Sequence, residues 1–530
     1  MQQHIDRKPQ PPDFHFHIII NFASVPVHQP LRDYPPQGEK WRYAGGHTQN
    51  CKKMIWTLSL FWTAILVYVI VVVSTVTLVL LENRQPAKTI AWTVVLVMLP
   101  VVGLVIFYFF GQNVRKERYI SRRQYNVLTR RMLADSVRFP ASDCPPKYEP
   151  LVRLFEKTNK AMPTSGNGIT VYNTGREWLQ ALLREIHAAK DHIHIETYII
   201  EDDAVGRLVR DALADSASRG VEVRLLYDDV GCWRVPNRFF ESIAASGVKV
   251  GAFLPVRFPS LTHKVNYRNH RKICVFDGRR GFIGGMNIAL RYVSTRLSPW
   301  RDMQLRIEGA AVAGLQRQFL GDWYFVTNNF VSDRRYFPAP QRVEHATDDC
   351  ILQIVQSSPV SRYPEIMYGI TWAISHARKY LYIQTPYFMP TEPVMQALQT
   401  AAMSGVDVKL MIPEKPDSFW LHYGNDSYLT AVLQAGIKVY AYLPGFLHSK
   451  CTIADDDWCS VGSSNMDFRS FENNFETNAF IYGRTAAVAA REGFERDLQD
   501  CREIKLSQWR RRPYSHRLME AYTRILSPLL

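Results

Sequence analysis

Two stretches of the chain carry the same small set of reactive side chains in the same order. The first, NHRKICVFDGRRGFIGGMN, runs from Asn269 to Asn287, and the second, GFLHSKCTIADDDWCSVGSSN, runs from Gly445 to Asn465. Because side chains alternate along a strand, the histidine and the lysine of each stretch should point to the same face. The shared residues are His270, Lys272, Asp277 and Asn287 in the first copy, and His448, Lys450, Asp455 and Asn465 in the second.

This set of groups suits the transfer of a phosphoryl group. A lysine ammonium and an asparagine amide can donate hydrogen bonds to phosphoryl oxygens. A neutral histidine can attack phosphorus, and a protonated histidine can give its proton to the leaving alkoxide. We therefore expect the two copies to face each other at one site, where one histidine becomes a phosphohistidine and the other acts as acid. The chemistry requires no metal and no cofactor.

The carboxylates near the motifs are expected to have supporting roles. Asp277 and Asp455 fall in the turn after each strand, so we expect them to hold the local backbone rather than to touch substrate. Each histidine also needs a partner that fixes its tautomer. Asp302, in WRDMQLRIEG, follows the first motif, and Glu476, in NFETN, follows the second. Their similar separations from the preceding histidines predict one carboxylate for each motif.

The segments around the motifs are repeated as well. RGVEVRLL from Arg219 resembles SGVDVKLM from Ser404, and SGVKVGAFLP from Ser246 resembles AGIKVYAYLP from Ala435. Each half opens with an apolar strand pattern, which amphipathic helical patterns follow. Strands that alternate with helices predict an α/β fold with a parallel or mixed sheet. We therefore predict two similar domains, at 166–345 and 346–530, that form a pseudo-dimer.

The N-terminal region has the pattern of a membrane anchor. Two uncharged apolar runs, 54–81 and 89–110, are each long enough to cross a bilayer as a helix, which predicts a transmembrane hairpin. Lysines and arginines flank the hairpin on its outer ends, so both termini are expected in the cytoplasm. Residues 1–53 read as a disordered tail, in which His15 and His17 lack further metal ligands. Residues 112–165 read as a basic linker.

The composition limits the partners of the chain. A formal net charge of +15 and a pI of about 9.4 suit an anionic partner, either nucleic acid or an acidic membrane surface. The eight cysteines contain no CxxC pair, which favours buried thiols in a reducing compartment. The C-terminal segment QWRRRPYSHRLMEAYTRILSPLL mixes basic and apolar residues, and predicts a helix that either lies on the membrane interface or packs on the domain. The aromatic stretch DSFWLHYGNDSY, from Asp417, has the same two interpretations: lipid contact or core packing.

The doubled motif matches the HxKxxxxDxxxxxxG[GS] signature of the phospholipase D superfamily, and the chain resembles its bacterial cardiolipin synthases over about residues 54–530. The resemblance includes VNYRNHRKICVFDG from Val265, WRDMQLRIEGAAV from Trp300, GSSNMDFRSFENNFETN from Gly462, LPVVGLVIFYFFGQNVRK from Leu99 and the C-terminal RILSPLL. It implies transfer of a phosphatidyl group between two phosphatidylglycerol molecules, which gives cardiolipin and glycerol. By analogy, His270 is the nucleophile and His448 the acid.

The resemblance also implies a location and a set of partners. It places a multi-pass protein in the bacterial inner membrane, with cytoplasmic catalytic domains, an anionic phospholipid substrate and no nucleic acid. Three alternatives remain at this stage. The same site could hydrolyse phospholipids or use phosphatidylethanolamine, the chain could be a membrane-tethered nuclease, or it could be a scaffold that binds anionic lipid without turnover.

Overall fold

The computed structural model describes residues 46–81, 86–99, 101–111, 122–134, 144–256, 266–294, 299–341, 343–344, 346 and 350–527. The chain divides into two compact units, Met1–Thr77 and Leu78–Leu530. Of the predicted tail, residues 1–45, with His15 and His17, lie outside the described residues. Residues 46–53 are helical, because α1 (Gly46–Leu81) begins before the first apolar run.

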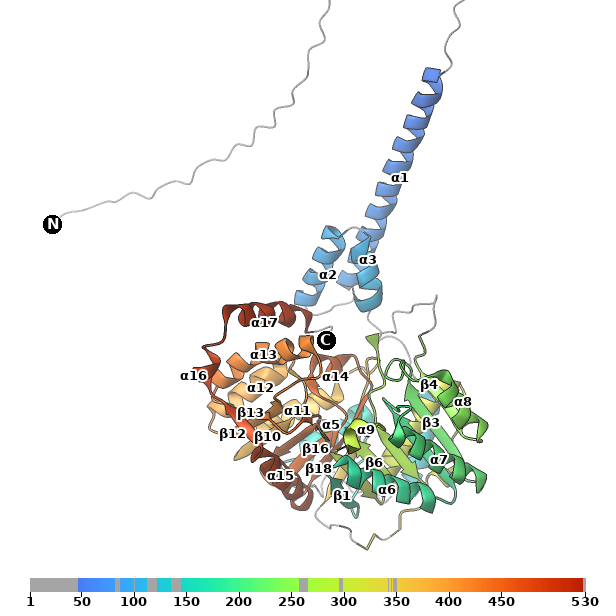
Figure 1. Ribbon diagram of the computed structural model, residues 1–530, viewed down its shortest axis with the longest axis vertical. Helices are drawn as coiled ribbons and strands as arrows, with labels where there is room; N and C mark the ends of the chain where they lie inside the picture. Colours follow the sequence, from blue (N-terminus) through green and yellow to red (C-terminus); the bar gives the residue numbers. More distant parts are fainter. Residues whose placement is uncertain are drawn as a thin grey trace, which may run out of the picture. The chain divides into compact units, whose positions relative to one another are not determined.

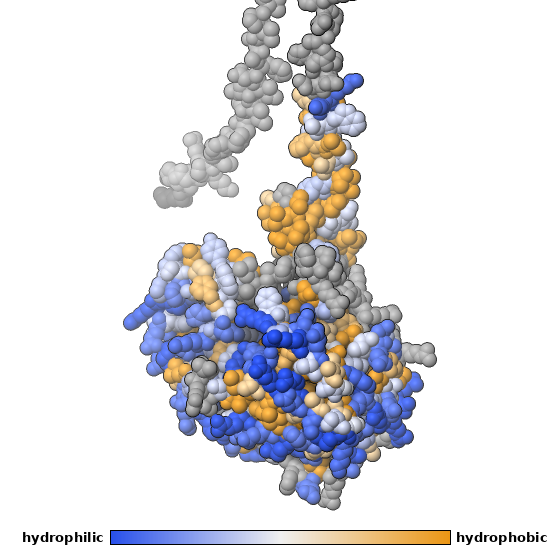
Figure 2. Space-filling model, turned by 45° about the vertical axis from the view of Figure 1, so that its right-hand side comes forward, coloured by the Kyte–Doolittle hydropathy of each residue, from blue (hydrophilic) through white to orange (hydrophobic). Residues whose placement is uncertain are grey.

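One helix in the described part of the chain, Lys52–Leu81, is long and apolar enough to cross a membrane, with a mean hydropathy of 2.9. Hydrophobic side chains cover its surface (Figure 2). The second predicted span is not one helix, since α2 (Pro86–Met98) is followed by the separate α3 (Val102–Ile106) and the π-helical η1 (Phe107–Gly111). Pro100 stands between α2 and α3 in the sequence, and proline interrupts helices because it lacks a backbone N–H.

The part of the chain after the N-terminal helices contains two large mixed sheets, which confirms the predicted duplicated α/β fold (Figure 1). The first sheet contains β1 (Gly168–Tyr172), β2 (His192–Thr197), β3 (Glu222–Asp228), β4 (Lys249–Phe253), β5 (Ile273–Phe276), β6 (Arg280–Gly284) and β8 (Gln304–Glu308), in the order β1-β8-β6-β5-β2-β3-β4. The second contains β9 (Ile351–Ser357), β10 (Tyr380–Gln384), β12 (Asp407–Pro413), β13 (Lys438–Tyr442), β15 (Cys451–Ala454), β16 (Trp458–Gly462), β18 (Glu476–Tyr482) and β19 (Cys501–Ile504), in the order β19-β13-β12-β10-β15-β16-β18-β9.

The two sheets have the same topology. β2, β3 and β4 are parallel neighbours, as are β10, β12 and β13. β5, β6, β8 and β1 continue the first sheet antiparallel, and β15, β16, β18 and β9 continue the second in the same way. Only β19 lacks a counterpart among the described strands of the first sheet. Two short two-stranded sheets complete the fold: β7 (Trp300–Arg301) with β14 (Phe446–Leu447), and β11 (Phe388–Met389) with β17 (Met466–Asp467).

Helices cover the sheets in matching positions. Around the first sheet are α6 (Gly175–Ala188), α7 (Ala204–Ser218), α8 (Asn237–Ala245), α9 (Leu290–Val293), α10 (Val312–Thr327) and η5 (Arg334–Tyr336). Around the second are α11 (Glu365–His376), α12 (Glu392–Met403), α13 (Phe419–Gln434), α14 (Phe468–Glu472), α15 (Arg484–Leu498), α16 (Leu506–Trp509) and α17 (Tyr514–Leu526). The predicted basic linker also forms two helices: α4 (Arg122–Ala134) packs on α10, and α5 (Glu149–Asn159) packs on α11 and β9.

The two halves share one apolar core. Ile273 and Val275 of β5 join a cluster that contains Leu352, Ile453 and Ala479 of the second sheet. The intervening Cys274 and Phe276 point to the other face, into the core beneath α6 and α7. β5 is therefore buried on both faces, which explains why it reads as a continuous apolar run rather than as an alternating strand.

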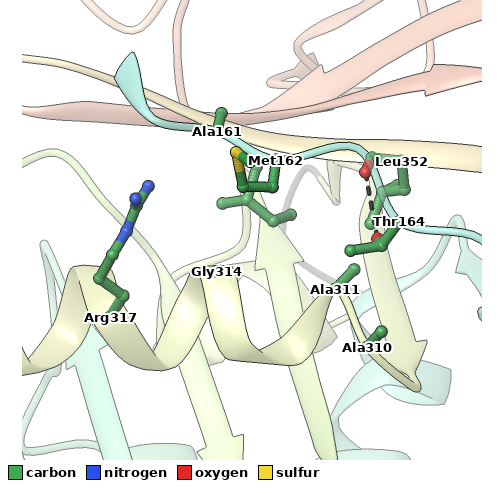
Figure 3. Close-up of a pocket in the computed structure, with 9 residues that line it drawn as sticks. Ala161, Met162, Thr164, Ala310, Ala311, Gly314, Arg317 and Leu352 are labelled. Carbon is green, nitrogen blue, oxygen red and sulfur yellow. Dashed lines mark hydrogen bonds between the residues drawn. The ribbon is translucent and has the colours of Figure 1, made fainter. Parts of the chain in front are cut away.

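Small residues let the halves approach closely where α10 meets β9. A Cβ added at Gly314 would lie 3.0 Å from the Ile354 side chain of β9. Thr164, beside this contact, exchanges hydrogen bonds with the backbone of Leu352 (Figure 3). The cavity that remains there is about 20 Å³, which is room for little more than one water molecule.

The turns after β5 and β15 have the same construction. Asp277 has φ 52° and accepts hydrogen bonds from the backbone N–H groups of Lys190, Asp191 and His192, at 2.8–3.0 Å. Asp455 has φ 56° and accepts from the N–H groups of three successive residues, Arg378, Lys379 and Tyr380, at 2.8–3.2 Å. The Lys147 ammonium adds a 2.7 Å ion pair to Asp455. The two aspartates therefore fasten each hairpin to the start of the neighbouring central strand.

We expect Asp277→Asn and Asp455→Asn to destabilise the fold by about 1–3 kcal/mol each, because an amide is a weaker acceptor for backbone N–H groups. The loss should be larger at Asp455, where the Lys147 ion pair also disappears. The turnover of the folded enzyme should stay near that of the parent, since the turns lie roughly 15 Å along the strands from the lysines. The unfolding midpoint and the specific activity of the full chain in detergent would measure both effects. Asp211→Asn, on the exposed surface of α7, is the control. Loss of turnover without a shift of the midpoint would contradict the structural role.

Candidate active site

The motif histidines and lysines precede the equivalent strands β5 and β15. Lys272 Nζ donates to the carbonyl oxygen of His270 at 2.6 Å, and Lys450 Nζ makes the same hydrogen bond to the carbonyl of His448. All four side chains are buried at the centre of the interface between the halves. Each His-x-Lys segment therefore has the same local conformation in both copies.

Each histidine is paired with a carboxylate from the opposite half. His270 Nδ1 lies 3.0 Å from Oε1 of Glu476, and His448 Nδ1 lies 2.6 Å from Oδ2 of Asp302. The sequence correctly indicated Asp302 and Glu476 as carboxylates near the motifs. The expected pairing of each with the histidine before it in the chain was wrong, because the partners are exchanged between the halves.

The backbone explains the exchange. The N–H of His270 donates to the carbonyl of Phe475 at 3.0 Å, and the N–H of His448 donates to the carbonyl of Arg301 at 2.7 Å. Phe475 and Arg301 directly precede the two carboxylates in the chain. The bridge between Asn269 and Phe475 and the pairing of β14 with β7 are both parallel. Each motif therefore docks its histidine beside the carboxylate of the other half.

Each carboxylate is held by its own sheet. A Cβ added at Gly285 would lie 2.2 Å from Oδ1 of Asp302, so the glycine leaves the space that this carboxylate fills. The matching position in the second half is Ser463, whose hydroxyl donates to Oε2 of Glu476 at 2.5 Å. The second residue of the G-[GS] signature, Gly285 or Ser463, thus lies against the carboxylate of its own half.

Burial sets the protonation of the site. It lowers the pKa of His270 to about 4, and the charge of Lys272 adds to this while Glu476 opposes it. Burial also lowers the pKa of His448 well below its usual range, and Lys450, Lys272 and His270 lower it further. The lysines follow the same trend, because burial lowers the pKa of Lys450 to about 8 and that of Lys272 well below its ordinary value. Both histidines thus respond to the lysines of both motifs, so the four residues form one electrostatic cluster.

The two carboxylates differ in their electrostatics. Burial raises the pKa of Asp302 to about 6, although the charge of Lys450 opposes the shift. Burial also opposes ionisation of Glu476, but His270, Lys272 and the Ser463 hydroxyl lower its pKa below the usual value. Glu476 therefore stays ionised at neutral pH, whereas Asp302 binds a proton at a pH closer to 7.

The asparagines of the motifs have different surroundings. Asn287 Oδ1 accepts from the N–H of Ile199 at 3.1 Å, and its Nδ2 donates to the Tyr292 hydroxyl at 2.6 Å. Tyr292 in turn lies beside His448, with 5.7 Å between the ring centroids. Asn465 lines a small polar cavity next to Lys450, and its Oδ1 accepts no hydrogen bond from the part of the chain that the structure describes. The binding of phosphoryl oxygens by Asn287 and Asn465 stays a prediction.

Sequence reasoning missed the aromatic rings around the histidines. His448 lies 5.1 Å from the Trp300 ring and 5.8 Å from the Phe446 ring, while His270 lies 5.0 Å from the Tyr198 ring, between centroids. Their positions in the sequence could have indicated two of these rings, because Trp300 and Phe446 each stand two residues before a predicted site residue. These rings limit the access of water to both imidazoles.

Comparisons with known proteins agree with this architecture. The family described as "Cardiolipin synthase, PLD-like domain" matches residues 182–323 and 370–498, and each matched range contains one complete motif and its following carboxylate. The family described as "Phospholipase D-nuclease N-terminal" matches residues 64–112. The structure of phosphatidylserine synthase from Haemophilus influenzae Rd KW20 has a similar fold, with a TM-score of 0.57 at 15% identity over 72% of this chain and 100% of that chain.

Curated relatives share most of the length. A cardiolipin synthase of Geobacillus kaustophilus is 35% identical over 90% of this chain and 95% of its own. A cardiolipin synthase of Alkalihalophilus pseudofirmus is 36% identical over 90% of this chain and 94% of its own. The chain therefore belongs to the cardiolipin synthases of the phospholipase D superfamily.

Proposed function

We propose that the chain transfers the phosphatidyl group of one phosphatidylglycerol to a hydroxyl of a second, giving cardiolipin and glycerol. Family membership supports the product. One observation carries the mechanism: two histidine–carboxylate pairs, each built from both halves, lie in one buried cluster with two lysines. Such a cluster supplies a nucleophile, a proton donor and positive charge at the same place.

The first step forms a covalent intermediate. Glu476 holds the proton on Nδ1 of His270, so the lone pair of Nε2 attacks the phosphorus of the donor lipid. The P–O bond to the glycerol headgroup breaks, and the protonated His448 gives its Nε2 proton to the leaving alkoxide. Glycerol leaves, and the phosphatidyl group remains on His270. Lys272 and Lys450 stabilise the charge on the phosphoryl oxygens.

The second step reverses the proton transfer. The neutral His448 takes the proton of a headgroup hydroxyl of the second phosphatidylglycerol, whose oxygen attacks the phosphorus. The P–N bond to His270 breaks, cardiolipin leaves, and both histidines return to their starting protonation. The site must exclude water during this interval, since hydrolysis of the intermediate would give phosphatidic acid.

The difference between the carboxylates supports this assignment of roles. Burial and the charge of Lys272 keep His270 neutral, although the ionised Glu476 opposes this. Glu476 also accepts hydrogen bonds from Ser463 and Asn474, so it holds the His270 ring in a fixed position for attack. Burial raises the pKa of Asp302 to about 6 but lowers the pKa of His448 well below its usual range, so the proton that His448 donates has to be taken up together with the substrate. A bound phosphodiester is an anion and favours the protonated His448.

The chemistry fits a location at the cytoplasmic face of the bacterial cell membrane. The apolar helix Lys52–Leu81 would anchor the chain, and α2, α3 and η1 together would form the other, interrupted arm of the hairpin. The positive residues that flank the two runs support cytoplasmic catalytic halves. The excess of basic residues favours anionic lipids over neutral ones.

Product analysis tests the function. We expect the full chain, reconstituted with headgroup-labelled phosphatidylglycerol, to form cardiolipin and free glycerol in equal amounts, with little phosphatidic acid. Mass spectrometry of the lipids and a glycerol assay would measure both. Phosphatidylethanolamine as the only lipid should release no ethanolamine, and plasmid DNA should stay intact. Phosphatidic acid as the main product would support the hydrolase alternative, and cleaved plasmid would support a nuclease.

The exchanged pairing predicts which variants share a defect. Four single variants test the roles with phosphatidylglycerol as substrate: His270→Ala, His448→Ala, Glu476→Gln and Asp302→Asn. Each should lower turnover by about 10²-fold or more. With phosphatidyl-para-nitrophenol, whose leaving group needs no proton, His448→Ala and Asp302→Asn should recover a burst of nitrophenolate. His270→Ala and Glu476→Gln should not, because the attacking nitrogen is missing or misplaced.

Stopped-flow absorbance would measure the burst, and labelled donor would reveal the phosphatidyl-enzyme. The pairs that behave alike are then His270 with Glu476 and His448 with Asp302, across the halves. Recovery by Glu476→Gln together with His448→Ala would instead indicate pairing within one half.

Lys450 predicts the alkaline side of the pH profile. Its ammonium has a pKa of about 8, so kcat/KM should fall as pH rises through that value and the positive charge is lost. Arginine stays charged, so Lys450→Arg, even if less active, should show a shallower alkaline decline. Initial rates over a pH series would show this, with the exposed Lys249→Arg as the control. An identical alkaline slope in Lys450→Arg and the parent would exclude this role of Lys450.

A further inference from the structure

The C-terminal helix α17 has an inner face that packs on the protein and an outer face that is apolar and exposed. Its inner face packs on α13: the Ser527 hydroxyl, just after the helix, lies 3.0 Å from the Tyr428 hydroxyl, and Arg524 donates to the carbonyl of Ser427 at 3.4 Å. Figure 1 shows α17 lying across α13 at the edge of the second half. The outer face carries Tyr514, Leu518, Tyr522 and Ile525, whose spacing of four, four and three residues places them on one side of a helix.

These outer side chains meet solvent instead of protein. Tyr514 is 76% exposed and Ile525 is 75% exposed, although the other side of the helix contains the buried Glu520 and Thr523. A helix that only needed to cover α13 would carry polar residues on its outer side. The exposed stripe is therefore available to a partner outside the described residues.

The stripe continues onto α13. Phe419 and Trp420, in the first turn of α13, are exposed as well. Aromatic contacts connect the two helices, because the Tyr423 ring lies 5.0 Å from Phe419 and 5.5 Å from His516 of α17. We call the six exposed residues the docking face: Phe419, Trp420, Tyr514, Leu518, Tyr522 and Ile525.

The charges beside the docking face are mostly positive. Between Lys505 and Ser527 the chain has six basic residues and one acidic residue, Glu520. Glu520 is already neutralised by Arg512, at 2.6 Å. Arg510, Arg511 and Arg517 remain exposed. A second copy of this face would bring like charges together, which disfavours a self-contact. Apolar rings and aliphatic side chains bordered by arginines instead match a bilayer that contains anionic lipid.

A path of side-chain contacts connects the start of α13 with the active site. Asp417, two residues before Phe419, accepts a hydrogen bond from the Tyr387 hydroxyl at 2.8 Å. The Tyr387 ring lies 6.3 Å from Phe446, which lies 5.8 Å from the imidazole of His448. A surface that dips into the bilayer at α13 would therefore bring lipid to the side of the site where His448 lies.

We propose that the docking face inserts into the headgroup region of an anionic bilayer and turns the active site toward its lipid substrate. The proposal rests on the proposed function, since only a lipid substrate makes this orientation useful. The two helices then work together: α13 presents aromatic residues near the site, and α17 adds the apolar stripe and its arginines.

A matched pair of variants tests the proposal. Leu518 on α17 and Leu208 on α7 are both 46% exposed, but only Leu518 belongs to the docking face. The full chain is reconstituted and assayed on vesicles of phosphatidylglycerol and phosphatidylcholine. It is also assayed in phosphatidylcholine vesicles with short-chain phosphatidylglycerol, dissolved below its critical micelle concentration.

We expect Leu518→Glu to lower the rate on vesicle substrate by about tenfold, because a carboxylate opposes insertion among apolar chains and anionic headgroups. Its rate on the dissolved substrate should equal that of the parent, which also shows that the variant is folded. Leu208→Glu should change neither rate. An unchanged vesicle rate in Leu518→Glu, or an equal loss on both substrates, would overturn the proposal. A parent that makes no cardiolipin at all would instead contradict the proposed function.

A direct measurement of depth complements the rates. A nitroxide attached at Ile525→Cys should gain oxygen accessibility and lose accessibility to a water-soluble nickel complex when the vesicles contain phosphatidylglycerol. The same label at Leu208→Cys should stay accessible to the nickel complex. The labelled parent gives the background from the native cysteines. Equal nickel accessibility at the two positions would show that α17 remains in water.

Discussion

The catalytic centre depends on hydrogen bonds that cross between the two halves. His270 pairs with Glu476 and His448 pairs with Asp302, and the backbone of each histidine docks on the residue before its partner. Neither half alone can fix the tautomer of its own histidine. The apolar core shared by the two sheets is therefore a condition for catalysis as well as for stability, because it aligns both exchanged pairs at once.

The two copies of the motif have different surroundings. The first motif has Arg271 between its histidine and lysine, and this guanidinium binds Asp322 and two carbonyls of the second half. The second motif has Ser449 at the same position. Gly285 and Ser463 differ in the same way, and only the serine adds a hydrogen bond to a catalytic carboxylate. Small differences of this kind give the two histidines different surroundings in an otherwise repeated fold, as the proposed division into nucleophile and proton donor requires.

Burial sets the charge state of the two motifs. Two lysines and two imidazoles are held in a region of low dielectric, which disfavours their charged forms and lowers each pKa. A phosphodiester that enters this region restores the charge balance and strengthens every donor around it. The donors of both motifs are thus already held close together, and aromatic rings lie beside both imidazoles.

The sequence by itself determined the duplication and the α/β class, and the doubled motif indicated the proposed chemistry, because the same residue types recur at the same spacing in both halves. It also identified Asp302 and Glu476, and the apolar helix near the N-terminus. Only the tertiary structure decided that the carboxylates exchange partners, that the run 89–110 is not one helix, and that α17 both packs and stays exposed. Partner choice across an interface depends on how two surfaces dock, and distances in the chain contain no information about that arrangement.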